Sequence, residues 1–170
     1  VKVSGLTSNC TIKSRHSDIS LKEVTGEVNI DNSYGMVDLR NVSLRATITA
    51  PHTEIWAEDV TGPLEVRNSY EKISLRRVGP SRLEGSHSGV DAQVVNGNLE
   101  ITDSYEPTVL KSVRGNLQIN GEHISVSAGD VVGETIYIST SYEDVTLTDF
   151  AGQTTVLLSH GDVTLTPLPL

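Results

Sequence analysis

Bulky and reactive side chains are scarce in this sequence. Its 170 residues include one Cys, one Trp, one Phe and one Met, and aromatic residues make up 4% of the chain. A single cysteine excludes an internal disulfide bond. A compact globular domain of this length normally buries more large side chains, so the composition favours a thin, extended core of small aliphatic residues.

Positive charge is scarce as well. The chain has 13 Lys and Arg against 22 Asp and Glu, which gives a formal net charge of -9. Phosphate groups are bound by clustered Lys and Arg, whereas the basic residues here are scattered, so we exclude nucleic acid and anionic membrane surfaces as partners. No apolar run has the length of a membrane-spanning segment, and none resembles a signal peptide.

An aromatic residue recurs along the whole chain at an almost constant interval. All five His and four of the five Tyr take part, and the two residue types alternate. The interval is about 18 residues, and such regularity indicates an internal repeat. We call these nine side chains the aromatic ladder: His16, Tyr34, His52, Tyr70, His87, Tyr105, His123, Tyr142 and His160.

Apolar residues recur at fixed distances in the sequence after each residue of the aromatic ladder. After His52, for example, three apolar residues follow at 55, 57 and 60, and a second pair at 64 and 66. Alternation with a period of two is typical of β-strands, so each unit of about 18 residues predicts two short strands. Cys10 falls in an apolar column and is interpreted as a small buried hydrophobic residue. Glycines recur between the two strands, where a bend needs a residue without Cβ, at Gly26, Gly62, Gly97, Gly115, Gly133 and Gly152.

Identical columns at a fixed interval are typical of units that stack and bury each other's apolar faces. The sequence therefore predicts an all-β fold, a single-stranded parallel β-solenoid of about nine 18-residue coils that occupies residues 1–170 as one domain. The alternation of His and Tyr leaves open a 36-residue coil. A β-propeller with 36-residue blades is the alternative fold, but 170 residues do not give a whole number of blades.

The two ends of the chain differ. Pro167 and Pro169 fall in the last predicted strand, where they block further pairing because proline has no backbone N–H. The N-terminal end has no such residue, and the repeat is already in progress at Val1, so we expect the chain to be truncated from a longer one. An open strand edge there can pair with further coils, another domain or a second copy of the chain.

Three segments resemble a known family. They read NSYGMVDLRNV at 32–42, TSYEDVTLTDFAG at 140–152 and HGDVTL at 160–165. They are similar to the repeat of the bacterial adhesin-like β-solenoids called toast-rack or DUF4097 domains. The resemblance implies a right-handed β-helix, usually extracytoplasmic and often joined to a membrane segment, with roles in adhesion or envelope-stress sensing and no catalytic residues. The chain departs from the family pattern where Glu71-Lys72 and Glu106-Pro107 replace Gly-Asp.

The histidines are the most obvious candidates for chemistry. In 18-residue coils they lie two coils apart, about 9 to 10 Å, which is too far to share a metal ion with ligand bonds of about 2 Å. In 36-residue coils they would be neighbours. We favour a structural interpretation in which His and Tyr stack alternately along one corner of the solenoid. A row of imidazoles also raises the hypothesis that mild acid loosens the rod through charge repulsion.

Catalysis and ligand binding have weaker signals. Some β-helices cleave polysaccharides, but this requires acidic residues gathered on one face, and here they are spread over different units. No calcium-binding nonapeptide motif is present, so we expect a protein that is not an enzyme and has no cofactor or metal. Trp56 points outward by the alternation, and an exposed Trp can anchor a sugar or protein partner, although it more often covers a strand.

Together these features favour a non-catalytic extracytoplasmic scaffold or adhesin-like binding domain, in the periplasm or at the cell surface. Its expected partner is a protein or a glycan. The alternatives are an envelope-stress sensing module that contacts a membrane-associated partner, and a polysaccharide-active enzyme. We expect membrane contact only through segments outside this chain or through partners.

Overall fold

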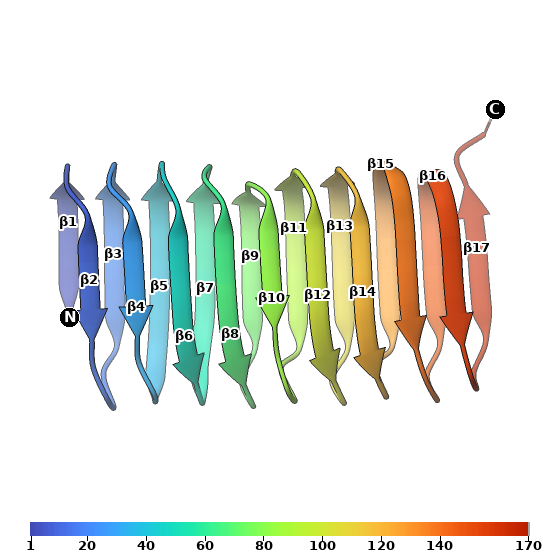
Figure 1. The fold of residues 1–170 in the computed structure, drawn as a ribbon, viewed down its shortest axis with the longest axis horizontal. Helices are drawn as coiled ribbons and strands as arrows, with labels where there is room; N and C mark the ends of the chain where they lie inside the picture. The colour runs from blue at the N-terminus through green and yellow to red at the C-terminus, as the bar shows by residue number, and fades with distance from the viewer. Residues whose placement is uncertain (170) are drawn as a thin grey trace.

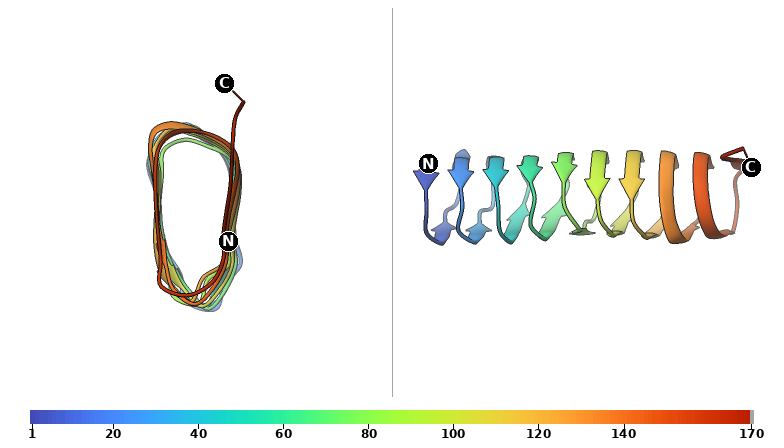
Figure 2. Two further views of the ribbon diagram at one scale, coloured as in Figure 1. Left: turned by 90° about the vertical axis from the view of Figure 1, so that its right-hand side faces the viewer. Right: turned by 90° about the horizontal axis from the view of Figure 1, so that it is seen from above.

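The computed structural model describes residues 1–169, and every regular element in it is a β-strand. The chain winds into flattened coils that stack along one axis, so the ribbon forms a rod with the two termini at opposite ends (Figure 1). Seen along the rod, the coils superimpose into one outline with two long sides (Figure 2). Among the described residues no helix is long and apolar enough to span a membrane. The predicted all-β solenoid is confirmed.

Each coil contributes one strand to each long side. The first side contains β1 (Lys2–Leu6), β3 (Ile19–Val24), β5 (Gly35–Val42), β7 (Thr53–Val60), β9 (Ile73–Val78), β11 (Val90–Asn96), β13 (Thr108–Arg114) and β17 (Val163–Pro167). The second side contains β2 (Cys10–Lys13), β4 (Val28–Asp31), β6 (Ala46–Pro51), β8 (Leu64–Ser69), β10 (Ser81–Glu84), β12 (Leu99–Ser104) and β14 (Leu117–Glu122). Two longer strands, β15 (Val126–Thr140) and β16 (Val145–Leu158), continue around the bend and contribute to both sides.

All strand pairs are parallel, and each residue pairs with its equivalent one unit further on. Ile55 of β7 faces Val37 of β5 on one side and Ile73 of β9 on the other. This register defines an 18-residue coil, which excludes both the 36-residue coil and the β-propeller. Units that are one residue shorter or longer keep the register because the bends absorb the difference, as in the register shift between Val132 and Thr135.

The apolar columns fill the space between the two sides. In the coil after His52, Ile55, Ala57 and Val60 are completely buried, and Val66 on the opposite side is buried as well. The cluster runs from coil to coil and consists almost entirely of Ile, Leu, Val and Ala. The predicted thin core of small aliphatic residues is confirmed. Cys10 packs against this core but is only half-buried, because the first coil has a neighbour on one side only.

At the glycine-containing bend, successive coils approach too closely for a side chain. A Cβ atom built on Gly62 would overlap the backbone carbonyl of Leu44 in the preceding coil and lie 2.9 Å from its Cα. A Cβ on Gly115 would lie 2.5 Å from the carbonyl carbon of Gly97. The prediction that these bends need glycine is confirmed, and the main reason is the close stacking of coils.

The sequence did not predict a second backbone feature, a residue in the left-handed conformation at the same position of every coil from β3 to β16. Strand pairing skips this position and resumes at the following valine column. The left-handed region disfavours residues other than Gly, Asn and Asp. At this one position of successive coils φ lies between 51° and 61°, and the residues are Glu23, Asn41, Asp59, Arg77, Val94, Ser112, Asp130 and Asp149.

The C-terminal end partly follows the prediction. Pro167 is the last residue of β17, as expected, whereas Pro169 lies beyond the strand. Leu168 still donates its N–H to the carbonyl oxygen of Phe150 at 3.0 Å, and the chain then leaves the coil (Figure 2). Proline at the edge of β17 removes one donor from this exposed strand.

Candidate functional site

The nine rings of the aromatic ladder stack in one uninterrupted column along a corner of the rod. Neighbouring ring centroids lie 4.5 to 5.2 Å apart, and the planes differ by at most 20°. These distances match the spacing of strands in a sheet, so the stacking follows directly from the coil repeat. Every contact joins a His to a Tyr, as the alternation predicted.

The ladder corner is held in place by an unusual backbone. His52 has φ 53° and Tyr70 has φ 72°, and most of the other ladder residues are also left-handed. Tyr34 and His160 are the exceptions, and in each case the following glycine has positive φ. A left-handed residue makes the tight turn between the two sides of a coil. The Tyr rings remain about half exposed, so the ladder forms a stripe on the surface.

A buried polar contact accompanies the alternation of His and Tyr coils. Two residues before Tyr70, the Nδ2 atom of Asn68 donates to the carbonyl oxygen of Thr53 in the preceding His coil at 3.1 Å and to that of Glu71 at 2.8 Å. Four of the five His coils have a small residue at the equivalent position, which leaves room for the polar side chain, and the exception is Leu158 in the last coil. Coils are therefore joined in pairs, by Asn32 to Ser17, Asn68 to Thr53, Asp103 to Ser88 and Thr140 to Ile124.

Asp103 is the charged member of this column. Its Oδ1 accepts the N–H of Ser104 at 2.7 Å and that of Ser88 at 3.3 Å, while its Oδ2 is buried without a partner. Burial raises the pKa of Asp103 to about 6, against the lowering effect of these two hydrogen bonds and of nearby His87. Glu106 raises it further.

The histidines are not arranged to share a metal ion. A Tyr ring separates each His from the next, because every 18-residue coil contributes one ring to the ladder. Among residues 1–169 no group of three or more His, Cys, Asp or Glu side chains is placed to hold a metal. The hypothesis of a shared histidine site depended on a 36-residue coil, and the strand register excludes that coil.

Trp56 lies on the outer face of the first side, as the alternation predicted. It is half-buried, and the guanidinium carbon of Arg76 sits over the indole ring at 5.7 Å from its centroid. Ser74, its neighbour in register on β9, is also buried although it points outward. The indole Nε1 is shielded and has no hydrogen-bond partner. Trp56 thus covers its own sheet, and one ring face is already occupied by Arg76.

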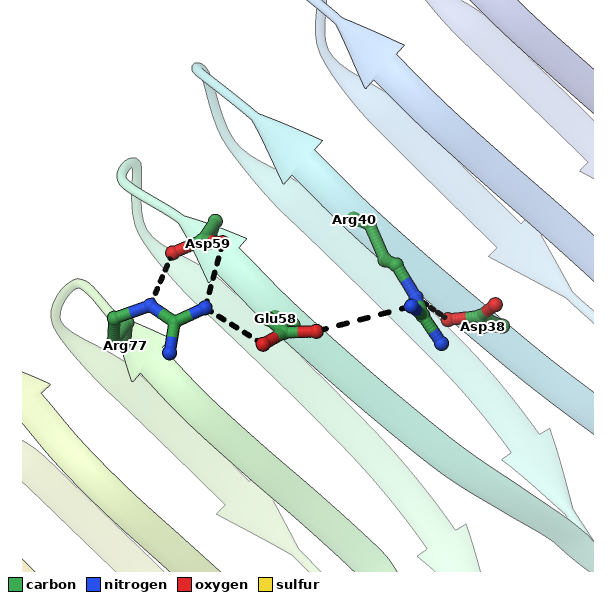
Figure 3. A network of polar contacts seen from close by, with 5 residues as sticks. All are labelled: Asp38, Arg40, Glu58, Asp59 and Arg77. Atoms are coloured by element: carbon green, nitrogen blue, oxygen red, sulfur yellow. Dashed lines mark hydrogen bonds and ion pairs between the residues drawn. The ribbon is translucent and has the colours of Figure 1, made fainter.

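Beside Trp56, five charged side chains from three strands form a continuous network (Figure 3). Arg77 donates to both Asp59 and Glu58 at 2.6 Å, and Glu58 reaches Arg40 at 4.0 Å. Arg40 in turn pairs with Asp38 at 2.8 Å. The hydrogen bond from Arg77 lowers the pKa of Asp59, and the bond to Asp38 raises the pKa of Arg40. We call these five residues the charged network.

A second ionic chain crosses the opposite side of the rod. Arg67 contacts Glu65 at 2.7 Å and Glu84 at 2.8 Å, and Arg82 contacts Glu84 at 3.0 Å and Glu100 at 3.5 Å. These pairs are exposed, so each contributes little to stability. Both long sides therefore present flat, mixed-charge surfaces.

The most distinctive hollow lies next to the ladder. It has a volume of about 370 Å³ and is lined by Tyr70, His87, Glu71 and Glu106 among others, with Gly89 leaving space at its base. Lys72 and Asp91, which form an ion pair at 3.2 Å, also line it. The hollow thus brings two ladder rings together with the carboxylates of Glu71 and Glu106.

Sequence reasoning located the ladder and Trp56, and the outward column that holds Arg40 and Glu58 indicated that opposite charges meet there, but it missed the buried polar column and the contacts of Asp38, Asp59 and Arg77 in the charged network. The polar column left a sequence signal, since a polar residue stands two positions before every ladder tyrosine. The charged network depends on side-chain geometry in three coils and left no signal as clear. Comparison with family models, with curated proteins and with solved structures found no match to this chain.

Proposed function

We propose that this chain is a non-catalytic, extracytoplasmic scaffold or adhesin-like binding domain that presents a rigid surface to a protein or glycan partner. The observation that carries the proposal is the unbroken parallel pairing from β1 to β17, with the aromatic ladder spanning the same length. Each coil is hydrogen-bonded to the next along the described residues, which supports a rod that keeps its shape. The extracytoplasmic location rests on the resemblance to the toast-rack domains.

The surface offers a binding mode suited to extended partners. Equivalent outward positions repeat at about 4.8 Å along the rod, which matches partners that have a repeating backbone of their own. Trp56 and the charged network bring aromatic, cationic and anionic side chains together on the first side. Aromatic and Arg side chains are common anchors in such interfaces.

The binding role is tested by probing arrays of glycans and extracellular proteins with the purified chain. A Trp56→Ala variant should lose binding to any partner that uses this patch. The matched control is Val109→Ala, which truncates an exposed side chain in the same outward column of β13. Equal binding by both variants would show that the patch is not used, and release of a product from a polysaccharide would show that the chain is an enzyme.

The scaffold role is tested by shortening the rod. Deletion of residues 88–123 removes two coils outside the patch of Trp56 and the charged network, and it joins His87 to Ile124, so His and Tyr still alternate. We expect a folded rod that is shorter by about 10 Å in small-angle scattering. When a second domain is fused to one end of the rod, the expected functional result is a shorter reach of that domain with unchanged affinity for the partner. An unchanged reach would contradict a spacer role.

A further inference from the structure

The polar column holds three donors and one carboxylate. Asn32 and Asn68 donate from Nδ2 to a carbonyl oxygen of the preceding His coil, and the Thr140 hydroxyl donates to the carbonyl oxygen of Ile124 at 2.9 Å. Asp103 stands at the same position but only accepts, from the N–H of Ser88 and Ser104. An ionised carboxylate cannot make the donor contact that the other three make.

The site of Asp103 is closed to solvent. The side chain is 4% exposed, and its Oδ2 has no hydrogen-bond partner. A Cβ atom on Gly85 in the preceding coil would lie 2.8 Å from the carboxyl group, and one on Gly121 in the following coil would lie 2.9 Å from the Asp103 carbonyl oxygen. Burying an unpaired charge in such a place is costly, whereas a neutral carboxyl both donates and accepts.

We propose that Asp103 is a proton-sensing side chain, which when neutral donates a hydrogen bond to the Ser88 backbone and joins the coils of His87 and Tyr105 more tightly than when ionised. Thr140 shows the geometry that the neutral form can adopt, because one oxygen both donates to Ile124 and accepts its N–H at 3.4 Å. Protonation of Asp103 acts on the ladder corner, because Ser88 directly follows His87 and Asp103 stands two residues before Tyr105.

Few charged groups face this carboxyl. From the two bends they are His87, which favours ionisation, and Glu106, which opposes it. On the neighbouring second-side strands, Glu84 points outward and pairs with Arg67 and Arg82, and Glu122 is exposed. The pKa of Asp103 is about 6, against an ordinary value of 3.8. The folded state therefore holds the proton more tightly than the unfolded state does.

Because the folded state holds the proton more tightly, protonation of Asp103 in acid stabilises the folded state. The contribution is fully present below the ordinary pKa of 3.8 and is lost as pH rises through about 6. A difference of about two pKa units corresponds to at most about a hundredfold change in the folding equilibrium constant. This effect is opposite to the loosening in mild acid that a row of histidines suggested.

The test compares the whole chain with Asp103→Asn, which restores the amide found at Asn32 and Asn68. Urea unfolding at about pH 5 and pH 7.5 should show that the wild type gains stability on acidification relative to the variant, by about tenfold in the equilibrium constant, because the full effect is reached only below the ordinary pKa. Asn68→Asp is the reciprocal variant and should acquire the same dependence in another coil. Equal pH dependence in wild type and Asp103→Asn would overturn the proposal.

Two further variants separate a proton sensor from a merely structural residue. The carboxyl carbon of Asp103, followed by ¹³C NMR, should titrate near the value given above in the wild type. Glu106→Gln should lower that midpoint, and His87→Gln should raise it, because each removes one of the two facing groups. A midpoint at the ordinary value of a carboxyl group, or one that neither variant moves, would refute the inference.

Discussion

Arg77 and Asp59 occupy the same position in neighbouring coils, and Nε and Nη2 of Arg77 donate to the two carboxylate oxygens of Asp59 at 2.6 and 2.9 Å (Figure 3). Both residues are left-handed, with φ 51° and 56°. The pair thus places opposite charges side by side at a position where the backbone itself is unfavourable for most residues. The ion pair helps to fix the register of β7 and β9.

The contribution of this pair should be small and sensitive to salt and pH. Asp59→Asn keeps a residue that tolerates the left-handed conformation and removes the charge, so we expect a loss of at most about 1 kcal/mol. Because the pKa of Asp59 is lowered, the wild-type advantage is present above the ordinary carboxyl range and lost as pH falls below it. Urea unfolding at about pH 7 and pH 3.5 measures this. An advantage of the same size at both pH values, or one unaffected by about 1 M NaCl, would contradict the prediction.

Val94 is the least suitable residue in the left-handed column. Its φ is 61°, its side chain is branched at Cβ, and 36% of it is exposed, so little packing is lost on replacement. We expect Val94→Asn to stabilise the chain by about 1 kcal/mol. Val109→Asn is the control, because Val109 is similarly exposed but lies in a regular strand, where Asn is disfavoured. Thermal unfolding of the two variants should give shifts of opposite sign, and a destabilised Val94→Asn variant would show that the strain is absent.

Gly62 and Gly129 allow the close stacking of coils to be tested. Neither glycine has positive φ, so alanine is compatible with both backbones. At Gly62 the new Cβ would overlap Leu44, whereas at Gly129 its only near neighbour is the Thr148 hydroxyl at 3.4 Å. We expect Gly62→Ala to cost about 1 to 3 kcal/mol and Gly129→Ala to be neutral or slightly stabilising. Denaturation midpoints of equal value for the two variants would contradict this account.

The spacing of the aromatic ladder was sufficient to predict a stacked β repeat, its parallel register and its core. In a stacked repeat one column fixes the position of all the others, and the pairing of Ile55 with Val37 and Ile73 follows from it. The ambiguity between an 18-residue and a 36-residue coil had a physical source. The backbone repeats with every coil, but buried contacts such as that between Asn68 and Thr53 join coils in pairs, so the chemistry repeats with every second coil.

The left-handed column was not predicted because its residues share a conformation and not a residue type. Asn41, Asp59, Asp130 and Asp149 fit the usual preference, but Glu23, Arg77 and Val94 do not. The environment of Trp56 was not predicted either, because it depends on how neighbouring side chains pack. Alternation placed the side chain on the outer face, but only the structure places Arg76 over its ring.

The contribution of ring stacking can be isolated at Tyr70. Its ring lies 4.8 Å from that of His52 and 5.2 Å from that of His87, so it takes part in two stacks. Tyr70→Phe keeps both stacks, whereas Tyr70→Leu keeps an apolar side chain and removes them. Phe and Leu meet the same cost in the left-handed backbone, so the comparison reports the rings alone. With about 0.5 to 1.5 kcal/mol for each aromatic pair, the Leu variant should be about 1 to 3 kcal/mol less stable than the Phe variant. Equal unfolding midpoints for the two variants would show that the ladder acts only as a cover for the corner of the rod.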